Sequence, residues 1–510
     1  MRPETPRMLS VCKEGVERIK SSPPTMDELN AQMKQPEINT ASPFDDLLSP
    51  MFPMTLRDDH ADVLSIATLD ESWDLNTLGK CTWLESFFPS GNCLDEGLKA
   101  QLLLNGIFGL SARFSTSLFH SMDPVNRGNQ FTERASALWD EIYKDHKSDI
   151  RSLQCLQGLI LVTFNALQSG PSEHAWSLCG HCVRLAYDLD LHTIDANYDH
   201  REESLDEWVA LEEKRRAWWT IWEMDTFSSA MSRRPFAIDC RFTQVLLPVS
   251  DIAWYNKTRV PSGFLNLHLD MPWKCLCDSP NQEPRAWFLI SLAAFRHSFE
   301  VMLLPEAHPQ LLHDAEAMIA CFALALPQNF QTDSGSMVFN KTNFARNNWI
   351  VCTLIILQCA RSLIEVKMHQ LGMNNSKSYE TSFSARPSDI MSRNLHQTCT
   401  SSLSELISAA QSMSPQYIPV CSPFILCALL GPGTAHVPDD RLSQADRSNQ
   451  LCAETIRLIL RNYGRYWVIG KVLMEVLELH GKSGRSSATT SKHSYGEFRP
   501  QWRGLVDSAY

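Results

Sequence analysis

The tetrapeptide Cys-Gly-His-Cys at 179–182 is the pattern in this sequence that most directly suggests chemistry. Paired cysteines at this spacing form the redox centre of dithiol oxidoreductases, where the first thiol lies exposed at a helix N-terminus that follows a strand. Here the helical pattern begins earlier, near Glu173, and no strand pattern precedes it. Cys179 and Cys182 fall on one helical face with core spacing. The pattern therefore favours core packing over a redox site.

A zinc site would have to use the same stretch. Cys179, His181 and Cys182 would need a further pair of ligands at suitable spacing. The only other close cysteine pair is Cys275 and Cys277, whose single-residue gap is unusual for structural zinc. We therefore expect no metal ligands and no cofactor within this chain.

Catalytic motifs are missing from the sequence. No phosphate-binding glycine loop, nucleophile elbow or metalloprotease helix occurs in it. Asp225 could serve as a general base, but no histidine or second acid stands near it to complete a catalytic set. We expect that the chain is not an enzyme and has no catalytic residues.

Two adjacent arginines, Arg215 and Arg216, precede Trp218, Trp219 and Trp222. Guanidinium groups bind phosphates and indoles stack on bases, so such a run can form a nucleic-acid surface. That surface would need exposed rings and several cations, whereas acids stand beside these arginines and the chain carries a formal net charge of −12. We interpret the run as a packed helix without DNA-binding residues.

On a helical wheel the aromatic residues of this run occupy a wide arc, which indicates a helix packed on most of its circumference. A narrow polar strip remains, and within it Glu212 and Arg216 form a favourable i,i+4 pair. The main face comprises Trp208, Leu211, Arg215, Trp218, Trp219 and Trp222, and the strip comprises Glu212, Arg216 and Glu223.

Arg215 and Asp225 lie inside the apolar arc, where an unpaired charge would cost several kcal/mol. Their separation is roughly 15 Å along a helix, which is too far for them to pair with each other. We predict that Asp225 accepts hydrogen bonds from Arg233 or Arg234 after the chain turns. We also predict that Arg215 finds a carboxylate or carbonyl on another helix, with its guanidinium lying on Trp219.

Helical periodicity runs through most of the chain and no alternating strand pattern recurs, so the predicted fold class is all-α. We expect a large multi-helix domain at 63–482, a disordered N-terminal region at 1–62 and a disordered C-terminal tail at 483–510. Within the N-terminal region, Ser42–Phe52 mixes acidic and bulky apolar residues as some activation segments do, although a plain linker can have the same composition.

Apolar runs and cysteines favour a location inside the cell, away from membranes. The most apolar run, Trp349–Leu357, has about half the length of a spanning helix, and the N-terminus lacks the apolar stretch of a secretory signal. The 16 cysteines are spread thinly along the chain, as expected for reduced and mostly buried residues.

Four phrases in order resemble the fungal-specific transcription factor domain, the regulatory (middle homology) region of fungal zinc-cluster transcription factors. They are an apolar helix ending in Leu-Asp-Leu-His, the acid–Arg–Arg–aromatic–Trp helix, an Arg-Pro turn and a segment ending in Leu-Pro. The resemblance is strongest over about 95–265. The positions that match the family signature are Arg215, Arg216, Trp218, Trp219, Asp225, Arg234, Pro235, Leu247 and Pro248.

The chain departs from the family pattern in two ways. Asp190 and Arg233 stand where the family usually has glycine, so the turn at Arg233 cannot rely on glycine's access to positive φ. The family typically carries an N-terminal binuclear zinc cluster that holds a helix for the major groove. Before residue 80 this chain has only Cys12, so we expect zinc, and direct DNA binding, only if a missing N-terminal cluster exists.

The resemblance implies a fungal transcription regulator that acts in the nucleus through its helical domain, and such factors often control metabolic or secondary-metabolite gene clusters. The implied partners are a homo- or heterodimer subunit, the transcription machinery and a small-molecule effector, with DNA reached only indirectly. Three mechanisms stay open: a DNA-binding segment missing from the gene model, a partner that carries the cluster, and competition for such a partner.

The alternative class is an all-α enzyme or a small-ligand-binding protein that is not involved in transcription. It predicts an enclosed cavity with convergent ionisable groups and at least one unpaired histidine or acid. A regulatory domain instead predicts extensive helix packing, with charges such as Arg215 and Asp225 satisfied internally.

Overall fold

The computed structural model of the chain describes eight ranges, which are residues 97–115, 119–145, 150–198, 203–265, 271–330, 337–371, 408–429 and 446–483. The predicted disordered region at 1–62, the segment Ser42–Phe52 and residues 63–96 of the predicted helical domain lie outside these ranges, as does the predicted C-terminal tail at 483–510 except for Ser483, which is the last residue of a helix. Within them the secondary structure is helical, without a strand, and an isolated antiparallel bridge joins Leu246 to Phe264. The all-α prediction is confirmed.

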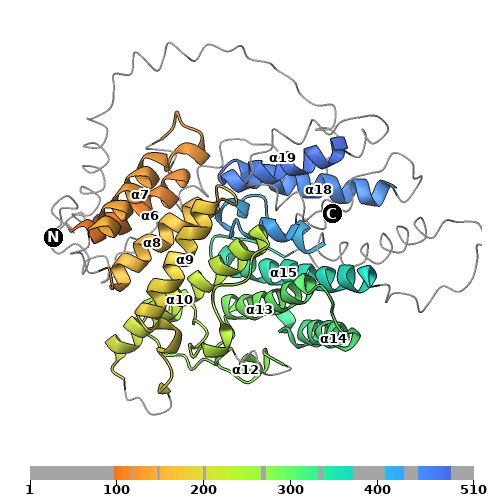
Figure 1. Ribbon diagram of the computed structural model, residues 1–510, viewed down its shortest axis with the longest axis horizontal. Helices are drawn as coiled ribbons and strands as arrows, with labels where there is room; N and C mark the ends of the chain where they lie inside the picture. The colour runs from red at the N-terminus through yellow and green to blue at the C-terminus, as the bar shows by residue number, and fades with distance from the viewer. Residues whose placement is uncertain are drawn as a thin grey trace, which may run out of the picture.

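Four helices form the N-terminal layer of the molecule, drawn in orange and yellow in Figure 1. The helix α6 packs against both α7 and α8, and α8 packs against α9. At the starts of α8 and α9, the Ser152 and Ser172 side chains accept hydrogen bonds from the backbone N–H groups of Cys155 and Ala175. These caps satisfy donors that have no partner within the helix. The bounds are α6 (Leu98–Ser111), α7 (Asn129–Lys144), α8 (Leu153–Leu167) and α9 (Glu173–Asp188).

The helix α10 (Leu205–Ser232) runs from this layer into the second half of the molecule (Figure 1). It begins with a capping box, in which the Ser204 hydroxyl accepts from the Glu207 N–H and the Glu207 carboxylate accepts from the Ser204 N–H. It ends at Arg233, whose backbone is left-handed with φ of 50°. Because α10 contacts α8, α9 and α13, it is enclosed from several sides.

Three longer helices form the second layer, drawn in green and teal in Figure 1. They are α13 (Pro284–Leu303), α14 (Pro309–Ala325) and α15 (Phe344–Gln370), and two short helices, α11 (Asp251–Tyr255) and α12 (Lys274–Cys277), lie between α10 and α13 in the chain. The helix α13 packs lengthwise on α15. Lys367 of α15 donates to the carbonyl oxygens of Met302 and Leu304, so its charge supports the C-terminal end of α13.

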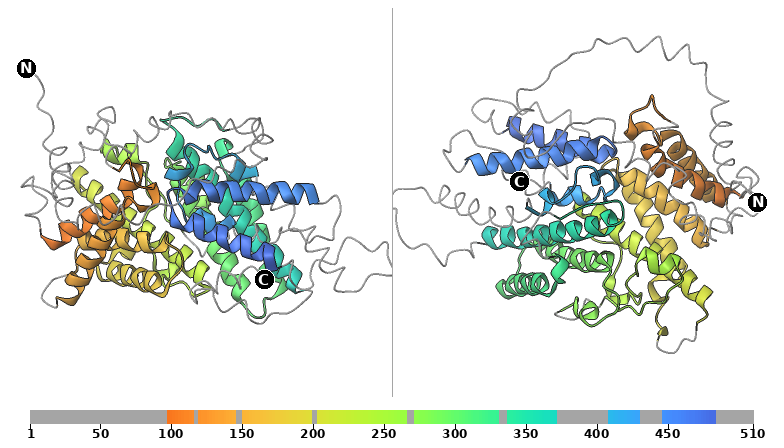
Figure 2. Two further views of the ribbon diagram at one scale, coloured as in Figure 1. Left: turned by 90° about the horizontal axis from the view of Figure 1, so that it is seen from above. Right: turned by 180° about the vertical axis from the view of Figure 1, so that it is seen from behind.

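Two further helices, α18 (Asp446–Gly464) and α19 (Val468–Ser483), form a pair at the C-terminal end of the described chain, shown in blue from two directions in Figure 2. Buried Arg113, just after α6, joins this pair to the N-terminal layer by donating to the carbonyl of Tyr466. Its guanidinium lies 4.0 Å from the ring centroid of Trp467. Burial lowers the pKa of Arg113 to about 10, so it stays charged at neutral pH.

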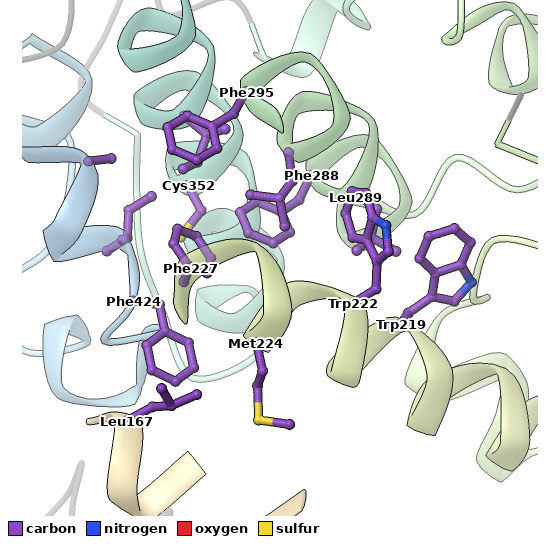
Figure 3. Close-up of a cluster of buried hydrophobic side chains, with 14 of the residues drawn as sticks. Leu167, Trp219, Trp222, Met224, Phe227, Phe288, Leu289, Phe295, Cys352 and Phe424 are labelled. Atoms are coloured by element: carbon purple, nitrogen blue, oxygen red, sulfur yellow. The ribbon is translucent and has the colours of Figure 1, made fainter. Parts of the chain in front are cut away.

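One large cluster of buried apolar side chains connects these helices. Figure 3 shows the part where α10 meets α13 and α15, with Trp219 and Trp222 from α10, Phe288 from α13 and Cys352 from α15. Trp218, Trp219 and Trp222 are each at most 1% exposed, which confirms the prediction of a packed tryptophan helix.

Among the described residues, two helices, α13 and α15, are long and apolar enough to cross a membrane by length and composition alone. The expectation from the run Trp349–Leu357 that no apolar segment has this length was wrong, because the apolar part of α15 continues to Met368. Within the fold, 78% of the most apolar window of α13 and 61% of that of α15 is buried, as in the core helices of a folded domain.

Candidate functional site

Buried ionic side chains on α10 form the candidate functional site. We call Glu212, Arg215, Arg216, Glu223 and Asp225 the α10 network. All except Arg216 are at most 5% exposed. A buried charge is costly unless it is paired and fully hydrogen-bonded, so the partners of these five residues determine what the network can do.

Arg215 pairs with Asp195 through two parallel hydrogen bonds. Its Nε donates to Oδ2 at 2.9 Å and its Nη2 donates to Oδ1 at 2.7 Å. Burial by itself lowers the pKa of Arg215, but the hydrogen bonds and charge of Asp195 raise it above its ordinary value. The predicted carboxylate partner is confirmed, but Asp195 lies in the turn that follows the short helix η4 (Leu191–Thr193), not on another helix.

Arg215 and Trp219 together fix one residue of the segment after α10. Asp195, held by Arg215, accepts a hydrogen bond from the Leu246 N–H at 3.0 Å. Trp219 donates its indole N–H to the Leu246 carbonyl at 2.8 Å. The predicted stacking of Arg215 on Trp219 is absent from the cation–π contacts of the described ranges, where the guanidinium instead makes two hydrogen bonds to the Asp195 carboxylate.

Glu212 and Arg216 hold the next part of the same segment. Glu212 Oε1 accepts from the Val249 N–H at 2.9 Å, and Arg216 Nη2 donates to the Val249 carbonyl at 2.7 Å. The predicted i,i+4 pair is confirmed, with Arg216 Nε 3.3 Å from Glu212 Oε1. Burial raises the pKa of Glu212, although Arg216 and Arg215 oppose this shift. Since Glu212 is fully buried, this part of the polar strip is interior.

Glu223, the last residue of the polar strip, is also interior. Its Oε2 lies 2.6 Å from Nη2 of Arg285 on α13, and its Oε1 accepts from the Ser422 hydroxyl at 3.3 Å. The Arg285 guanidinium lies 4.2 Å from the ring centroid of Trp349 on α15. This ion pair therefore links α10 to both helices of the second layer and to the segment around residue 422.

Asp225 has a partner that the sequence did not suggest. Its Oδ2 accepts from Nη1 of Arg296 on α13 at 3.2 Å and from the Ile238 N–H at 3.1 Å, while Oδ1 accepts from the Ala237 N–H at 3.0 Å. Arg296 also donates to the Thr226 hydroxyl at 2.9 Å and to the Ile238 carbonyl at 2.9 Å. Asp225 and Arg296 thus hold the turn after α10 against α13.

The prediction that Arg233 or Arg234 binds Asp225 was wrong. Arg233 ends α10 in a left-handed conformation, so the chain folds back and brings backbone N–H groups to the carboxylate rather than arginine side chains. The Arg234 guanidinium lies over the half-exposed ring of Trp176 on α9, 4.2 Å from its centroid.

The remaining signature positions lie on α10 or on the segments that it holds. Trp218 and Leu247 are fully buried. The carbonyl of Pro248 accepts from the Asn281 amide at 3.0 Å, and the carbonyl of Pro235 accepts from a serine hydroxyl at 3.3 Å. The nine signature residues therefore lie either on α10 or on two segments that pack against it, which are the turn at 234–238 and the segment at 246–249.

Both departures from the family pattern have a left-handed backbone. Asp190 has φ of 53° and Arg233 has φ of 50°. The turn at Arg233 therefore has positive φ without glycine's freedom to adopt it, because the arginine itself takes this conformation. A left-handed conformation costs a residue with a Cβ roughly 1–2 kcal/mol, less for aspartate than for most others.

Sequence reasoning did not find Asp195 and Arg296. Asp195 stands 20 positions from Arg215, and Arg296 stands 71 positions from Asp225, so no local spacing relates them. One signal was available for Arg296, which is a lone cation within the apolar run of α13 and so requires a buried partner.

The Cys-Gly-His-Cys motif lies on α9 with both thiols facing the core. Cys179 is 2% exposed and Cys182 is fully buried. Burial raises the pKa of both thiols, to about 12 for Cys182, so both remain protonated. The prediction of core packing is confirmed for this motif.

Zinc, which the family pattern implies, does not fit the residues present. The described ranges contain no group of three or more histidine, cysteine or acidic side chains able to hold a metal ion. The thiols of Cys275 and Cys277 donate to backbone carbonyls of Pro272 and Trp273 instead. Upstream of residue 80 the sequence offers only Cys12.

The α10 network can position chain segments, since each of its charges is matched by another part of the same molecule. Asp195, Arg285 and Arg296 supply the opposite charges, and backbone groups of residues 237–249 make further hydrogen bonds with the side chains of the network. This internal pairing is the arrangement expected of a regulatory scaffold.

Comparison with known protein families gives a match over a large part of the chain. The family described as "Fungal specific transcription factor domain" matches residues 79–349, which is more than half of the 510 residues. No solved structure matches the chain.

Several fungal regulators are similar to the chain. A Zn(2)-C6 fungal-type transcription factor of Fusarium oxysporum f. sp. lycopersici is 31% identical over 161 residues, covering 30% of this chain and 14% of that protein. The pigment biosynthesis transcriptional activator pigB of Monascus ruber is 26% identical over 164 residues, covering 31% and 29%. The tropolone cluster transcription factor tropK of Talaromyces stipitatus is 26% identical over 156 residues, covering 31% and 26%. The matched stretch thus spans less than a third of each relative.

Proposed function

Because the chain belongs to the family of fungal-specific transcription factor domains, we propose that it is a transcription regulator and not an enzyme, and that it acts in the nucleus through protein contacts of its helical domain. The observation that carries this proposal is the family match across 79–349, within which the charges of the α10 network are paired internally. The nuclear location is supported by the kind of relatives found, which are zinc-cluster transcription factors.

We propose that the chain controls a metabolic or secondary-metabolite gene cluster. Two of its relatives support this: one is a pigment biosynthesis activator and the other is a tropolone cluster factor. Deleting the gene and measuring transcripts genome-wide tests the idea. We expect a co-located set of biosynthetic genes to change expression, whereas changes scattered over unlinked genes would contradict cluster control.

We propose that the chain reaches DNA indirectly. A zinc-cluster module, carried by a partner subunit or encoded upstream, would make the contacts with DNA. Two observations support this: the sequence has only Cys12 before residue 80, and the described residues hold no group of metal ligands. The helical domain, in turn, resembles the part that such factors use for regulation. Homo- or heterodimerisation, or docking of the transcription machinery, would then deliver the regulatory signal. Zinc would belong to that module.

A tethering experiment tests the regulatory activity directly. The full chain is fused to an unrelated DNA-binding domain and brought to a reporter gene in a fungal host. We expect reporter expression to differ several-fold from that with the DNA-binding domain alone. Unchanged expression, with the fusion present in the nucleus and bound to the reporter, would refute the proposal.

A matched pair of variants shows whether the reporter effect requires the folded domain or only the presence of a fused protein. Asp225→Ala removes the buried partner of Arg296, whereas Asp206→Ala removes the exposed partner of Lys257, which leaves the fold intact. We expect the first variant to abolish the reporter effect and the second to retain it.

For a small effector, we propose the cluster of Tyr187, His192 and Trp218. His192 Nδ1 and Trp218 Nε1 are buried polar atoms without a hydrogen-bond partner. The rings of Tyr187 and His192 lie 4.8 Å apart, and those of His192 and Trp218 lie 6.3 Å apart. A thermal-shift screen of fungal metabolites tests this cluster, and a stabilising compound should lose its effect in Trp218→Phe, which removes only the indole N–H donor and part of the ring.

A further inference from the structure

Two buried cysteines from distant parts of the chain lie with their sulfur atoms in contact. Cys352 is on α15, Cys421 directly follows the short helix η8 (Ile418–Val420), and their Sγ atoms are 3.3 Å apart. The residues are 69 positions apart in the sequence. Neither is bonded to another cysteine, and both lie in the core, at 0% and 3% exposure.

The surroundings of the two sulfurs differ. The hydrogen bond between the two thiols lowers the pKa of Cys421 against the effect of burial, and the Tyr463 hydroxyl and the Ser422 backbone act in the same direction. For Cys352 the same hydrogen bond and burial raise the pKa. A sulfur that accepts several hydrogen bonds is stabilised as a thiolate, which is the nucleophilic form of cysteine.

A second pair of thiols in the same region provides a comparison. Cys359, two helical turns further along α15, and Cys427 influence each other electrostatically, yet no sulfur contact joins them. Burial raises the pKa of each to about 12. The Cys352–Cys421 pair is therefore distinguished both by its contact and by its hydrogen-bond donors.

We propose that Cys352 and Cys421 are a reversible dithiol–disulfide site that reacts with hydroperoxides, with Cys421 as the attacking sulfur and Cys352 as the resolving one. The sulfurs need to approach by roughly 1.3 Å to reach the disulfide bond length of about 2.0 Å. This inference does not depend on the proposed function, because it concerns thiol chemistry alone.

The reaction balances in two steps. The Cys421 thiolate attacks the terminal oxygen of the hydroperoxide, so that an S–O bond forms, the O–O bond breaks, and the leaving alkoxide or hydroxide takes up a proton. Cys421 is oxidised to the sulfenic acid and the peroxide is reduced. The Cys352 sulfur then attacks Cys421, the S–S bond forms and the S–O bond breaks, and the hydroxide leaves as water with the Cys352 proton.

Access and consequence both follow from the position of Cys421. It lies in non-helical backbone between the short helix η8 and a helical stretch at 425–429, where local opening costs less than in the middle of a long helix. The disulfide would tie α15 to the segment that also contacts Glu223 through Ser422 and α18 through Tyr463. Oxidation would therefore fasten the second layer to the C-terminal helical pair.

The test uses the full wild-type chain. The protein is exposed to hydrogen peroxide under native conditions, remaining thiols are blocked with iodoacetamide, and peptides are mapped by mass spectrometry without reduction. We expect a peptide linked through Cys352 and Cys421 to form at least about ten-fold faster than one linked through Cys359 and Cys427. We also expect dithiothreitol to reverse it. Equal rates for the two pairs, or unmodified Cys352 and Cys421 after other thiols have reacted, would overturn the proposal.

Variants assign the two roles. In Cys352→Ser, Cys421 should accumulate as sulfenic acid that dimedone captures, whereas in Cys421→Ser, Cys352 should stay reduced. Cys359→Ser is the matched control on the same helix and should form the linked peptide at the wild-type rate. Circular dichroism confirms that each variant is folded before it is oxidised. Dimedone capture at Cys352 in the Cys421→Ser variant would reverse the assigned roles and refute that part of the proposal.

Discussion

Asp225 and Arg296 form an ion pair between α10 and α13, with Nη1 of Arg296 3.2 Å from Oδ2 of Asp225 and both side chains at most 5% exposed. The carboxylate also accepts two backbone N–H groups from the turn after α10. One aspartate thus holds two elements at once, a helix that comes later in the chain and the turn that immediately follows its own helix.

We predict that Asp225→Ala lowers the free energy of unfolding by about 3–5 kcal/mol, because it leaves the Arg296 charge buried without a carboxylate and two buried N–H groups without their acceptor. Urea denaturation followed by circular dichroism measures the change. The exposed pair of Lys257 and Asp206 provides the control, and Asp206→Ala should cost at most about 1 kcal/mol. Similar losses in the two variants would mean that burial of Asp225 adds nothing to stability.

We predict that Trp219→Ala costs about 3–5 kcal/mol of unfolding free energy, because it opens a cavity in the core and leaves the Leu246 carbonyl without its indole donor. Trp176→Ala on α9 is the matched control, since that indole is 42% exposed and should cost about 1 kcal/mol. Thermal denaturation of both variants measures the two losses of stability. A loss below about 1 kcal/mol for Trp219→Ala would place this ring outside the core.

We predict that Arg233→Gly stabilises the protein by about 0.5–1 kcal/mol, because glycine adopts the left-handed backbone at this position without a Cβ penalty. Asp190→Gly should have a smaller effect of the same sign, since aspartate tolerates that conformation better. Ser232→Gly, one residue earlier and within α10, should instead lower the melting temperature. Destabilisation by Arg233→Gly would show that the arginine side chain contributes more than its backbone costs.

We predict that stability falls as the pH rises above about 9. Burial raises the pKa of Cys182, Cys275, Cys359 and Cys427 from 9.0 to about 12, so these thiols ionise first in the unfolded chain. Ionisation then stabilises the unfolded state, by about 1.4 kcal/mol for each thiol at one pH unit above its unfolded pKa. This loss continues until the folded thiols titrate near pH 12.

Denaturation midpoints measured between about pH 8 and pH 10 test that slope. Replacing one buried thiol, as in Cys359→Ala, should make the pH dependence shallower by the contribution of that thiol, whatever its effect on stability at neutral pH. A midpoint that is constant over this range, with the protein still folded, would contradict the prediction.

The sequence was sufficient for the packed helix and for the need to pair its charges. The spacing of Trp218, Trp219 and Trp222 defines a wide apolar arc, and an interior Arg215 or Asp225 has to find a partner because desolvation is costly. Such arguments depend only on helical geometry and on the energy of burying a charge. The all-α class followed in the same way from periodicity over the whole chain.

The identity of the partners could not be predicted. Asp225 was assigned to nearby arginines because closeness in sequence was the only guide, whereas tertiary packing brought Arg296 to it from 71 positions away. Glu212 and Glu223 formed a polar strip on the helical wheel, yet neighbouring helices cover that strip. The conformation of Arg233 was missed for a different reason, since a single residue type does not reveal that the surrounding structure will impose positive φ.

The contact of Arg113 with Tyr466 and Trp467 bears on how this polypeptide can be divided. The family match ends at residue 349, shortly after α15 begins, and before both Tyr466 and Trp467. A fragment that ends at residue 349 would lack the Trp467 indole and the Tyr466 carbonyl, so the Arg113 guanidinium would face water. It would also expose the side of α13 that packs on α15. The part of the sequence that matches the family is therefore shorter than the folded region in which these contacts are made.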